Sequence, residues 1–140
     1  MPVVRLLVVD DVEYWRRCLA SLLQTEVQIA IVGEASDGVE AVQMAEKMQP
    51  CMVLLDVGLP RLNGLKAGAW IRKLAPQAKL LFVSHESDPD IVSAAFQLGA
   101  LGYILKSDAM RELVVAIRSA IRGEKFLSDG LIGQRSRHGM

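Results

Sequence analysis

Three aspartates, a serine and a lysine stand at the ends of short apolar runs in the sequence. Asp10 and Asp11 follow the first run, Asp56 follows the third, Ser84 follows the fourth and Lys106 closes the fifth. If these runs are neighbouring parallel strands, their carboxyl ends lie at one edge of a sheet, and the five side chains meet there. The chemistry to consider is that of a carboxylate cluster with an ammonium group and a hydroxyl group beside it.

A cluster of three carboxylates favours a hard cation. The negative charges repel one another unless protons or a cation offset them. Oxygen ligands with no His or Cys nearby, and with room left for water, suit Mg²⁺ better than an all-protein Ca²⁺ cage. An aspartate beside Mg²⁺ can attack a phosphoryl group, while Lys106 and Ser84 contact the transferred oxygens. Charge alone does not decide which acid attacks, but Asp56 ends what should be the central strand, and Asp10 and Asp11 are adjacent and suited to share the metal.

The elements that must position these residues alternate along the chain. Apolar residues three and four apart indicate amphipathic helices between the apolar runs, and the last of these helices is expected over 110–122. Asp88 followed by Pro89 predicts a helix start, and Gly99 and Gly123 suit helix C-terminal positions. Five strand-helix units with right-handed crossovers predict an α/β fold with a parallel sheet between two helix layers. The strands are expected at 3–9, 29–32, 52–55, 80–83 and 103–105.

Length and composition predict one domain. The chain has 140 residues, half of them apolar, and a formal net charge of zero. We expect the domain to span 1–126 and 127–140 to form a short, flexible C-terminal tail. No signal peptide or membrane-length apolar run is found, so a cytoplasmic protein without membrane contact is expected. The spacing of Cys18 and Cys51 suggests neither a zinc site nor a disulfide framework.

The strand-end residues, in their order and spacing, resemble the receiver domains of bacterial two-component response regulators. The resemblance covers about 3–130 and is specific because several separated positions agree at once. It implies the flavodoxin-like, doubly wound (βα)5 three-layer sandwich with strand order 2-1-3-4-5, and a phosphorylation switch in place of a metabolic enzyme. The motifs that carry it are Val8-Val9-Asp10-Asp11, Leu55-Asp56-Val57-Gly58-Leu59-Pro60, Asn63-Gly64, Val83-Ser84 and Gly102-Tyr103-Ile104-Leu105-Lys106.

The resemblance assigns a role to each matching position. It implies that Asp56 is the phosphoacceptor, that Asp11 binds Mg²⁺ directly and that Asp10 holds the metal through water. The backbone carbonyl of Gly58 would be a further ligand. The remaining implied roles belong to Lys106, which bonds the phosphoryl group, Ser84, which closes onto it, and Tyr103, whose side chain turns on activation. The surface of the fourth helix, fifth strand and fifth helix would then respond, and a homodimer through it is expected.

Finer features resemble the NarL/LuxR-type subfamily, notably the Gly102 to Ser107 motif and the stretch from Arg118 to Ser128. In that group a receiver usually precedes a helix-turn-helix module. Only 17 residues follow Gly123, so no DNA-binding domain and no direct nucleic-acid contact are expected in this chain. The implied partner is a sensor histidine kinase or a phosphotransfer protein, and transcription is the expected output if a DNA-binding module belongs to the system.

Two positions near the site differ from the common family pattern. His85 stands where a small residue usually follows the switch hydroxyl, and its ring could crowd the entrance or simply be a half-exposed loop residue. Gly58 offers no side chain to guide or block a hydrolytic water, whereas Glu86 does. These residues leave the lifetime of the phosphorylated state open.

Three other functions compete with a phosphorylation switch. A flavodoxin-like electron carrier needs a phosphate loop after the first strand, where this chain has Asp10-Asp11-Val12-Glu13. An aspartyl phosphatase normally has a second acid two residues after its nucleophile, and Gly58 stands there. A binding module that keeps the fold without the phosphorylation chemistry remains the main alternative.

Overall fold

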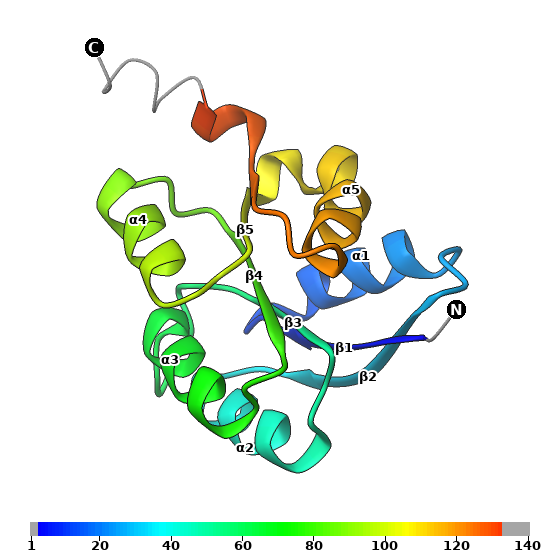
Figure 1. Cartoon of the computed structure of the whole chain (residues 1–140), viewed down its shortest axis with the longest axis vertical. Helices are drawn as coiled ribbons and strands as arrows, with labels where there is room; N and C mark the ends of the chain where they lie inside the picture. Colours follow the sequence, from blue (N-terminus) through cyan, green and yellow to red (C-terminus); the bar gives the residue numbers. More distant parts are fainter. Residues whose placement is uncertain (1–2, 133–140) are drawn as a thin grey trace.

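The computed structural model describes residues 3–132 and shows strands and helices in alternation (Figure 1). Each predicted strand and helix is present, with ends that differ by up to three residues. The elements in chain order are β1 Val4–Val9, α1 Glu13–Leu23, β2 Ile29–Ala35, α2 Gly38–Met48, β3 Met52–Leu55, α3 Gly64–Leu74, β4 Lys79–Ser84, α4 Pro89–Gln97, β5 Gly102–Leu105, the short 3₁₀ helix η1 Lys106–Asp108, α5 Ala109–Ile121 and β6 Phe126–Leu127.

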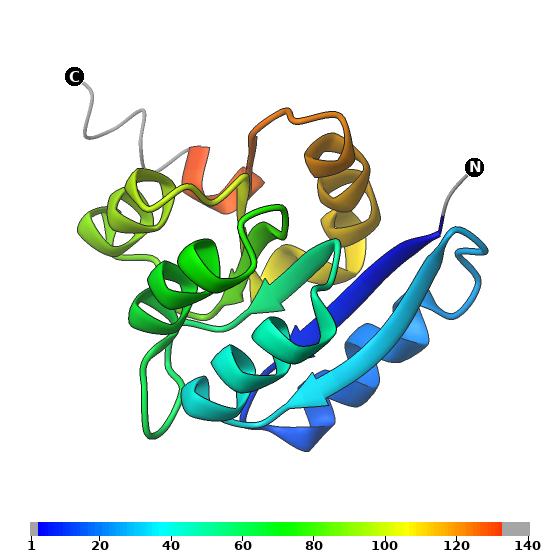
Figure 2. The same cartoon turned by 60° about the horizontal axis from the view of Figure 1, so that its bottom comes forward.

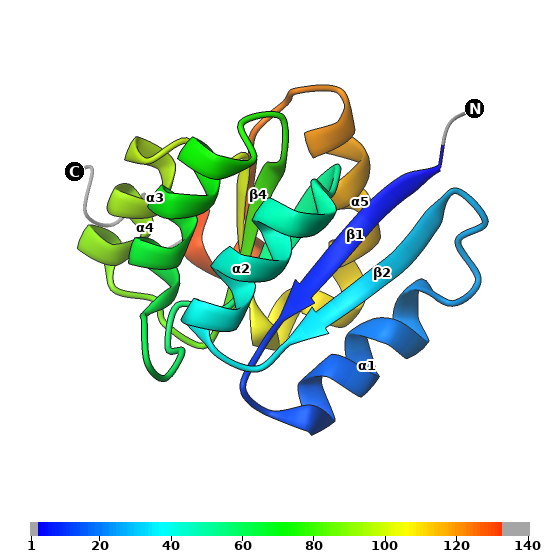
Figure 3. The same cartoon turned by 90° about the horizontal axis from the view of Figure 1, so that it is seen from below.

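All the strands run parallel in one sheet of order β2-β1-β3-β4-β5-β6. The predicted order is confirmed, and β6 extends it by one strand. Figure 3 shows β1 and β2 side by side, pointing in the same direction. Because the order reverses between β1 and β3, the loops after these two strands open a crevice at the carboxyl edge of the sheet.

The sheet buries both faces, which explains why its strands are continuous apolar runs in place of alternating ones. Leu7 and Val53 point into the core cluster under α2, α3 and α4, whereas Leu6 and Leu54 point into the cluster under α1 and α5. Figure 1 shows α2, α3 and α4 on one side of the sheet and α1 and α5 on the other. In the part of the chain from residue 3 to 132, no helix has the length and apolar character needed to cross a membrane.

Local sequence signals set the ends of the helices. The Asp88 side chain accepts a hydrogen bond from the Asp90 amide, with Pro89 in the first turn, as predicted. Gly99 and Gly123 follow α4 and α5 with φ of 112° and 76°, values in the left-handed region that favours glycine. These residues therefore define where α4 begins and where the loops after α4 and α5 start.

Residues 126–132 pack against the domain, so the described structure continues past the domain boundary predicted at 126. Phe126 and Leu127 pair with Gly102 and Tyr103 as β6, and a helical turn follows at 129–132. Leu131 is buried with 4% of its surface exposed. Figure 2 shows this segment between α4 and α5. Two apolar residues are too few to show a strand period, so this pairing could not be predicted from the sequence. Residues 133–140, the rest of the predicted tail, lie outside the described residues.

Ser128 anchors this segment. Its fully buried hydroxyl donates to Asp108 at 2.5 Å and lies 3.0 Å from Glu112, and the Gly130 amide also donates to Asp108. The hydrogen bond from Ser128 lowers the pKa of Asp108, and Arg111 acts in the same direction. The segment therefore covers the side of β5 that would otherwise be an open sheet edge.

Candidate functional site

The five predicted side chains meet at the carboxyl edge of the sheet. Asp10, Asp11 and Asp56 each offer a carboxylate oxygen, and these three oxygens lie within 4.8 Å of one another. Asp10 and Asp56 are buried, whereas Asp11 is exposed. The geometry follows from the topology, because β1 and β3 are hydrogen-bonded neighbours that end side by side.

Lys106 lies at the centre of this cluster. Its ammonium nitrogen is 2.7 Å from Asp10 Oδ2 and 3.0 Å from Asp56 Oδ2, and its side chain is only 2% exposed. Burial by itself would lower the pKa of Lys106, but the hydrogen bonds to the two carboxylates outweigh it and raise the pKa. Lys106 is therefore a protonated, buried cation at neutral pH.

Asp10 is held firmly in place. One carboxylate oxygen accepts from the Val12 amide at 2.9 Å, the other contacts Lys106, and only 1% of the residue is exposed. Burial raises the pKa of Asp10, and the hydrogen bonds from Lys106 and Val12 oppose that rise. Asp10 thus has little freedom to meet an incoming group.

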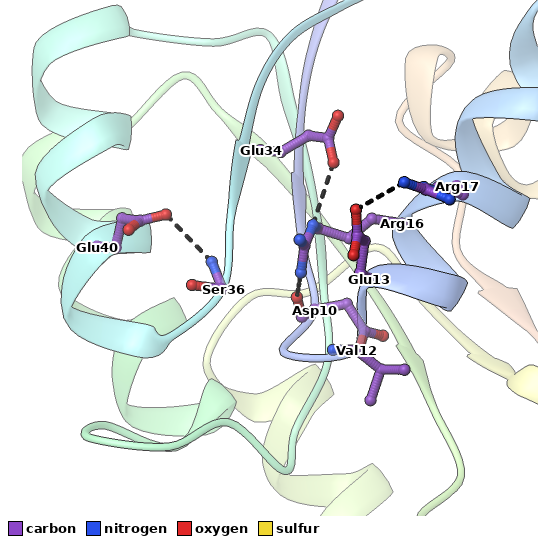
Figure 4. A network of polar contacts seen from close by, with 8 residues as sticks. All are labelled: Asp10, Val12, Glu13, Arg16, Arg17, Glu34, Ser36 and Glu40. Carbon is purple, nitrogen blue, oxygen red and sulfur yellow. Dashed lines mark hydrogen bonds and ion pairs between the residues drawn. The ribbon is translucent and has the colours of Figure 1, made fainter.

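Polar contacts fix the loop between β1 and α1, as Figure 4 shows. Arg16 donates to the Asp10 backbone carbonyl at 2.7 Å and to Glu34 at 3.1 Å, which ties α1 to the end of β2. Glu13 and Arg17 form an ion pair on the outer side of the same helix. Next to this braced loop, Asp11 is exposed and lines the pocket at the edge of the crevice.

The loop between β3 and α3 carries Asp56 and Gly58. Its backbone turns back on itself, because the Gly64 amide donates to the Val57 carbonyl at 2.7 Å. Asn63 caps α3 by accepting from the Lys66 amide. Space around Gly58 is open, since no atom of the described residues lies within 4 Å of a Cβ added there.

Ser84 and Tyr103 are joined through Glu86. The Ser84 hydroxyl oxygen accepts from the Glu86 amide at 3.1 Å, and the Tyr103 hydroxyl donates to the Glu86 carbonyl at 2.6 Å. Tyr103 is fully buried and stacks on Phe82, and burial raises its pKa to about 12. The Tyr103 carbonyl in turn accepts from the Ser128 amide. A continuous path thus runs from the crevice to the C-terminal segment.

An open pocket of about 340 Å³ forms the entrance to this cluster. Asp10 is not among the residues that line it, whereas Asp11 and Asp56 are. Two aromatic residues are also part of its wall, Trp15 and His85. The full lining is Asp11, Val12, Trp15, Asp56, Val57, Gly58, Ser84, His85, Glu86 and Lys106.

Comparison with known proteins decides the family. The model of the response regulator receiver domain matches residues 6–118. The chain belongs to the response regulator receiver family. The predicted family is confirmed, and the receiver fold places its carboxylate cluster where the sequence predicted it.

Relatives and solved structures extend this receiver assignment to the NarL/LuxR type. The transcriptional regulatory protein LiaR of Bacillus subtilis is 34% identical over 138 residues, 96% of this chain and 65% of LiaR. The response regulator protein VraR of Staphylococcus aureus is 33% identical over 135 residues, with the same coverage. This receiver therefore spans just under two thirds of the length of these relatives.

Two solved structures show the same fold over most of the receiver. A LuxR-family response regulator from Aurantimonas sp. SI85-9A1 has a TM-score of 0.91 and 29% identity, and 97% of each chain is covered. The receiver domain of the putative response regulator NarL from Mycobacterium tuberculosis has a TM-score of 0.83 and 31% identity, over 89% of this chain and all of that one.

The sequence did not reveal the place of Trp15 in this receiver. Trp15 belongs to the apolar stripe of the first helix, and such a residue is usually part of the core. In the structure its ring centroid lies 5.0 Å from the Lys106 nitrogen and 5.6 Å from the His85 ring. The available signal was its position in the first helical turn after Asp11, which brings a side chain close to the strand ends.

Proposed function

We propose that Asp56 accepts a phosphoryl group from a sensor histidine kinase or a phosphotransfer protein, and that this receiver thereby switches a protein surface. The observation that carries the proposal is the buried Lys106 ammonium, 3.0 Å from an Asp56 carboxylate that opens into the pocket. An oxygen of Asp56 bonds to phosphorus as the donor nitrogen leaves, and Lys106 offsets the charge on the transferred oxygens.

Pocket access combined with a Lys106 contact supports Asp56 over the other two acids as the phosphoacceptor. Asp10 has both oxygens in contact with protein donors and does not line the pocket. Asp11 is exposed and at the entrance, and within residues 3–132 it forms no ion pair like the one between Asp56 and Lys106. Asp56 combines access from the pocket with that contact.

The residues present fit a Mg²⁺ ion. The donors are all oxygen atoms, three carboxylates bring them within 4.8 Å, and the space at Gly58 is open. We assign Asp11, Asp56 and the Gly58 carbonyl as direct ligands and Asp10 as a ligand through water. When bound, Mg²⁺ supplies positive charge that offsets the phosphoryl oxygens. Asp10 keeps Lys106 in place beside them.

Intact mass tests the phosphoacceptor. With acetyl phosphate and Mg²⁺, the wild type should gain one phosphoryl group, while Asp56→Asn should gain none because an amide is a poor nucleophile. A metal chelator should prevent the gain in the wild type. Asp11→Asn serves as the matched variant, since it should slow the reaction while still placing the phosphoryl group on Asp56.

Two outcomes would contradict this assignment. If Asp56→Asn were still modified, another acid would be the acceptor. If the wild type gained no mass, the alternative of a binding module that acts without phosphorylation would be favoured.

The path through Glu86 suggests how the signal leaves the site. If Ser84 turns toward a phosphoryl oxygen, it releases the Glu86 amide, and the loop that holds the Tyr103 hydroxyl changes with it. Tyr103 is already buried, so its hydroxyl contact is what changes in this proposal. The responding surface is formed by α4, β5 and α5, with β6 (Phe126–Leu127) paired along the edge of β5.

Self-association tests this output. Beryllofluoride with Mg²⁺ should shift the wild type toward a homodimer in sedimentation velocity, and Asp56→Asn should not respond. Tyr103→Phe keeps the buried ring and removes only the hydroxyl, so it should respond less than the wild type. A dimer that forms equally with and without beryllofluoride would show that assembly is not coupled to Asp56, and a monomer throughout would move the output to a partner protein.

A further inference from the structure

Lys106 has an aromatic ring beside it that the receiver chemistry above does not use. The centroid of the Trp15 ring is 5.0 Å from the Lys106 nitrogen, within cation–π range. We infer that Trp15, supported by His85, is a positioning residue that prepares the Lys106 ammonium for the phosphoryl oxygens. This inference rests on the proposed function of Asp56.

The surroundings of the Lys106 ammonium indicate that the Trp15 ring excludes water from it. An ammonium has three N–H groups, and the contacts with Asp10 and Asp56 account for two of them. The Lys106 side chain is nevertheless only 2% exposed. Because Trp15 lines the pocket next to Lys106, its ring occupies space in which water would otherwise solvate the charge.

Trp15 is itself held by its neighbours. Its ring meets His85 edge to face, with centroids 5.6 Å apart and an interplanar angle of 76°. Tyr14 contacts it in the same manner at 6.0 Å. The contact with His85 joins α1 to the loop after β4, so the two rings form a wall on the Lys106 side of the pocket.

This wall affects phosphoryl uptake only if it acts differently before and after the group arrives. A contact of equal strength in both states would change neither the rate nor the affinity. The difference lies in water: without the Trp15 ring, the free Lys106 ammonium is hydrated, and that water must leave when a phosphoryl oxygen enters. With the ring in place, the ammonium is already dehydrated and pointing at the carboxylates.

The test compares two substitutions that separate ring character from bulk. Trp15→Leu removes the π face, whereas Trp15→Phe keeps a smaller one. With saturating Mg²⁺, Trp15→Leu should bind beryllofluoride about fivefold more weakly than the wild type, because the entering anion must then displace water that solvates the Lys106 ammonium. Trp15→Phe should lie between the two. The initial rate of phosphorylation by acetyl phosphate should follow the same order.

Two further measurements separate positioning from general damage to the fold. Mg²⁺ affinity should be the same in all variants, because the assigned ligands are oxygen atoms and the Trp15 side chain is not one of them. His85→Ala, a change at an exposed loop position, should weaken beryllofluoride binding in the same direction and by less. In a Trp70→Phe background, Trp15 is the sole tryptophan of the chain, and its emission should change when beryllofluoride binds.

The outcomes distinguish this inference from the proposed function. If the wild type does not bind beryllofluoride, the phosphoacceptor proposal fails and this inference fails with it. If the wild type binds but Trp15→Leu binds equally well, the inference alone is overturned. Equal weakening in Trp15→Leu and Trp15→Phe, with Mg²⁺ affinity reduced as well, would show that Trp15 only fills space.

Discussion

Replacing Gly64 with alanine should destabilise the protein by at least about 3 kcal/mol and weaken Mg²⁺ binding at the same time. A Cβ at Gly64 would lie 1.9 Å from the Asp56 carbonyl oxygen and 2.8 Å from Val57 Cα. Both are backbone atoms, so no side chain can turn away to relieve the overlap. The loop that presents Asp56 and Gly58 must therefore move as a whole, and the assigned ligands move with it.

Gly58→Ala is the matched control in the same loop. A Cβ at Gly58 meets nothing within 4 Å, so the free energy of unfolding should stay within about 0.5 kcal/mol of the wild type. Denaturant unfolding gives the stability of each variant, and amide shifts during Mg²⁺ titration report on the site. Equal stability of the Gly64 and Gly58 variants would contradict the steric explanation.

The position of the acids explains why the site could be predicted from the sequence. A cluster at the carboxyl ends of parallel strands needs acids directly after apolar runs, and Asp10, Asp11 and Asp56 stand there. Once the runs are assigned to strands, topology brings these residues together without any knowledge of side-chain packing. The strands themselves were recognisable because both faces of the sheet are buried, which leaves continuous apolar runs.

Features that depend on contacts between distant segments were not predictable in this way. The second strand extends to Ala35, beyond the predicted end at residue 32, because Gly33 and Glu34 interrupt the apolar run while the pairing with β1 continues. A register shift between Leu6 and Leu7 accompanies this pairing. Glycine and glutamate, the residue types at positions 33 and 34, carry no local signal for a strand.

The C-terminal segment and the aromatic wall have the same cause. Ser128 is an ordinary polar residue until the fold brings it to Asp108, 20 positions away in the chain. Trp15 and His85 lie 70 residues apart and meet only because α1 and the loop after β4 border one crevice. The sequence located the chemistry, whereas the contacts that orient it depend on the packed structure.

Replacing Lys106 with methionine should destabilise the protein by about 3 kcal/mol at neutral pH, because it leaves two buried carboxylates without their cation. Methionine keeps an unbranched apolar side chain of similar length, so most of the packing remains. Asp10 and Asp56 contact Lys106 at 2.7 and 3.0 Å and would then repel each other. Lys66→Met, at an exposed position of α3, is the control and should change stability by less than about 0.5 kcal/mol.

The dependence of this loss on pH and Mg²⁺ identifies its electrostatic origin. Burial already raises the pKa of Asp10 in the presence of Lys106, and removing the ammonium raises it further. A carboxyl group whose pKa is raised in the folded state stabilises the protein below its unfolded pKa, and this contribution is lost as pH rises through the folded pKa. The Lys106→Met variant should therefore approach the wild type in acid and differ most at neutral pH. Mg²⁺ should raise its melting temperature more than that of the wild type, since the ion replaces the missing charge. If the stability loss of Lys106→Met did not change with pH or with Mg²⁺, it would be caused by lost packing and not by lost charge.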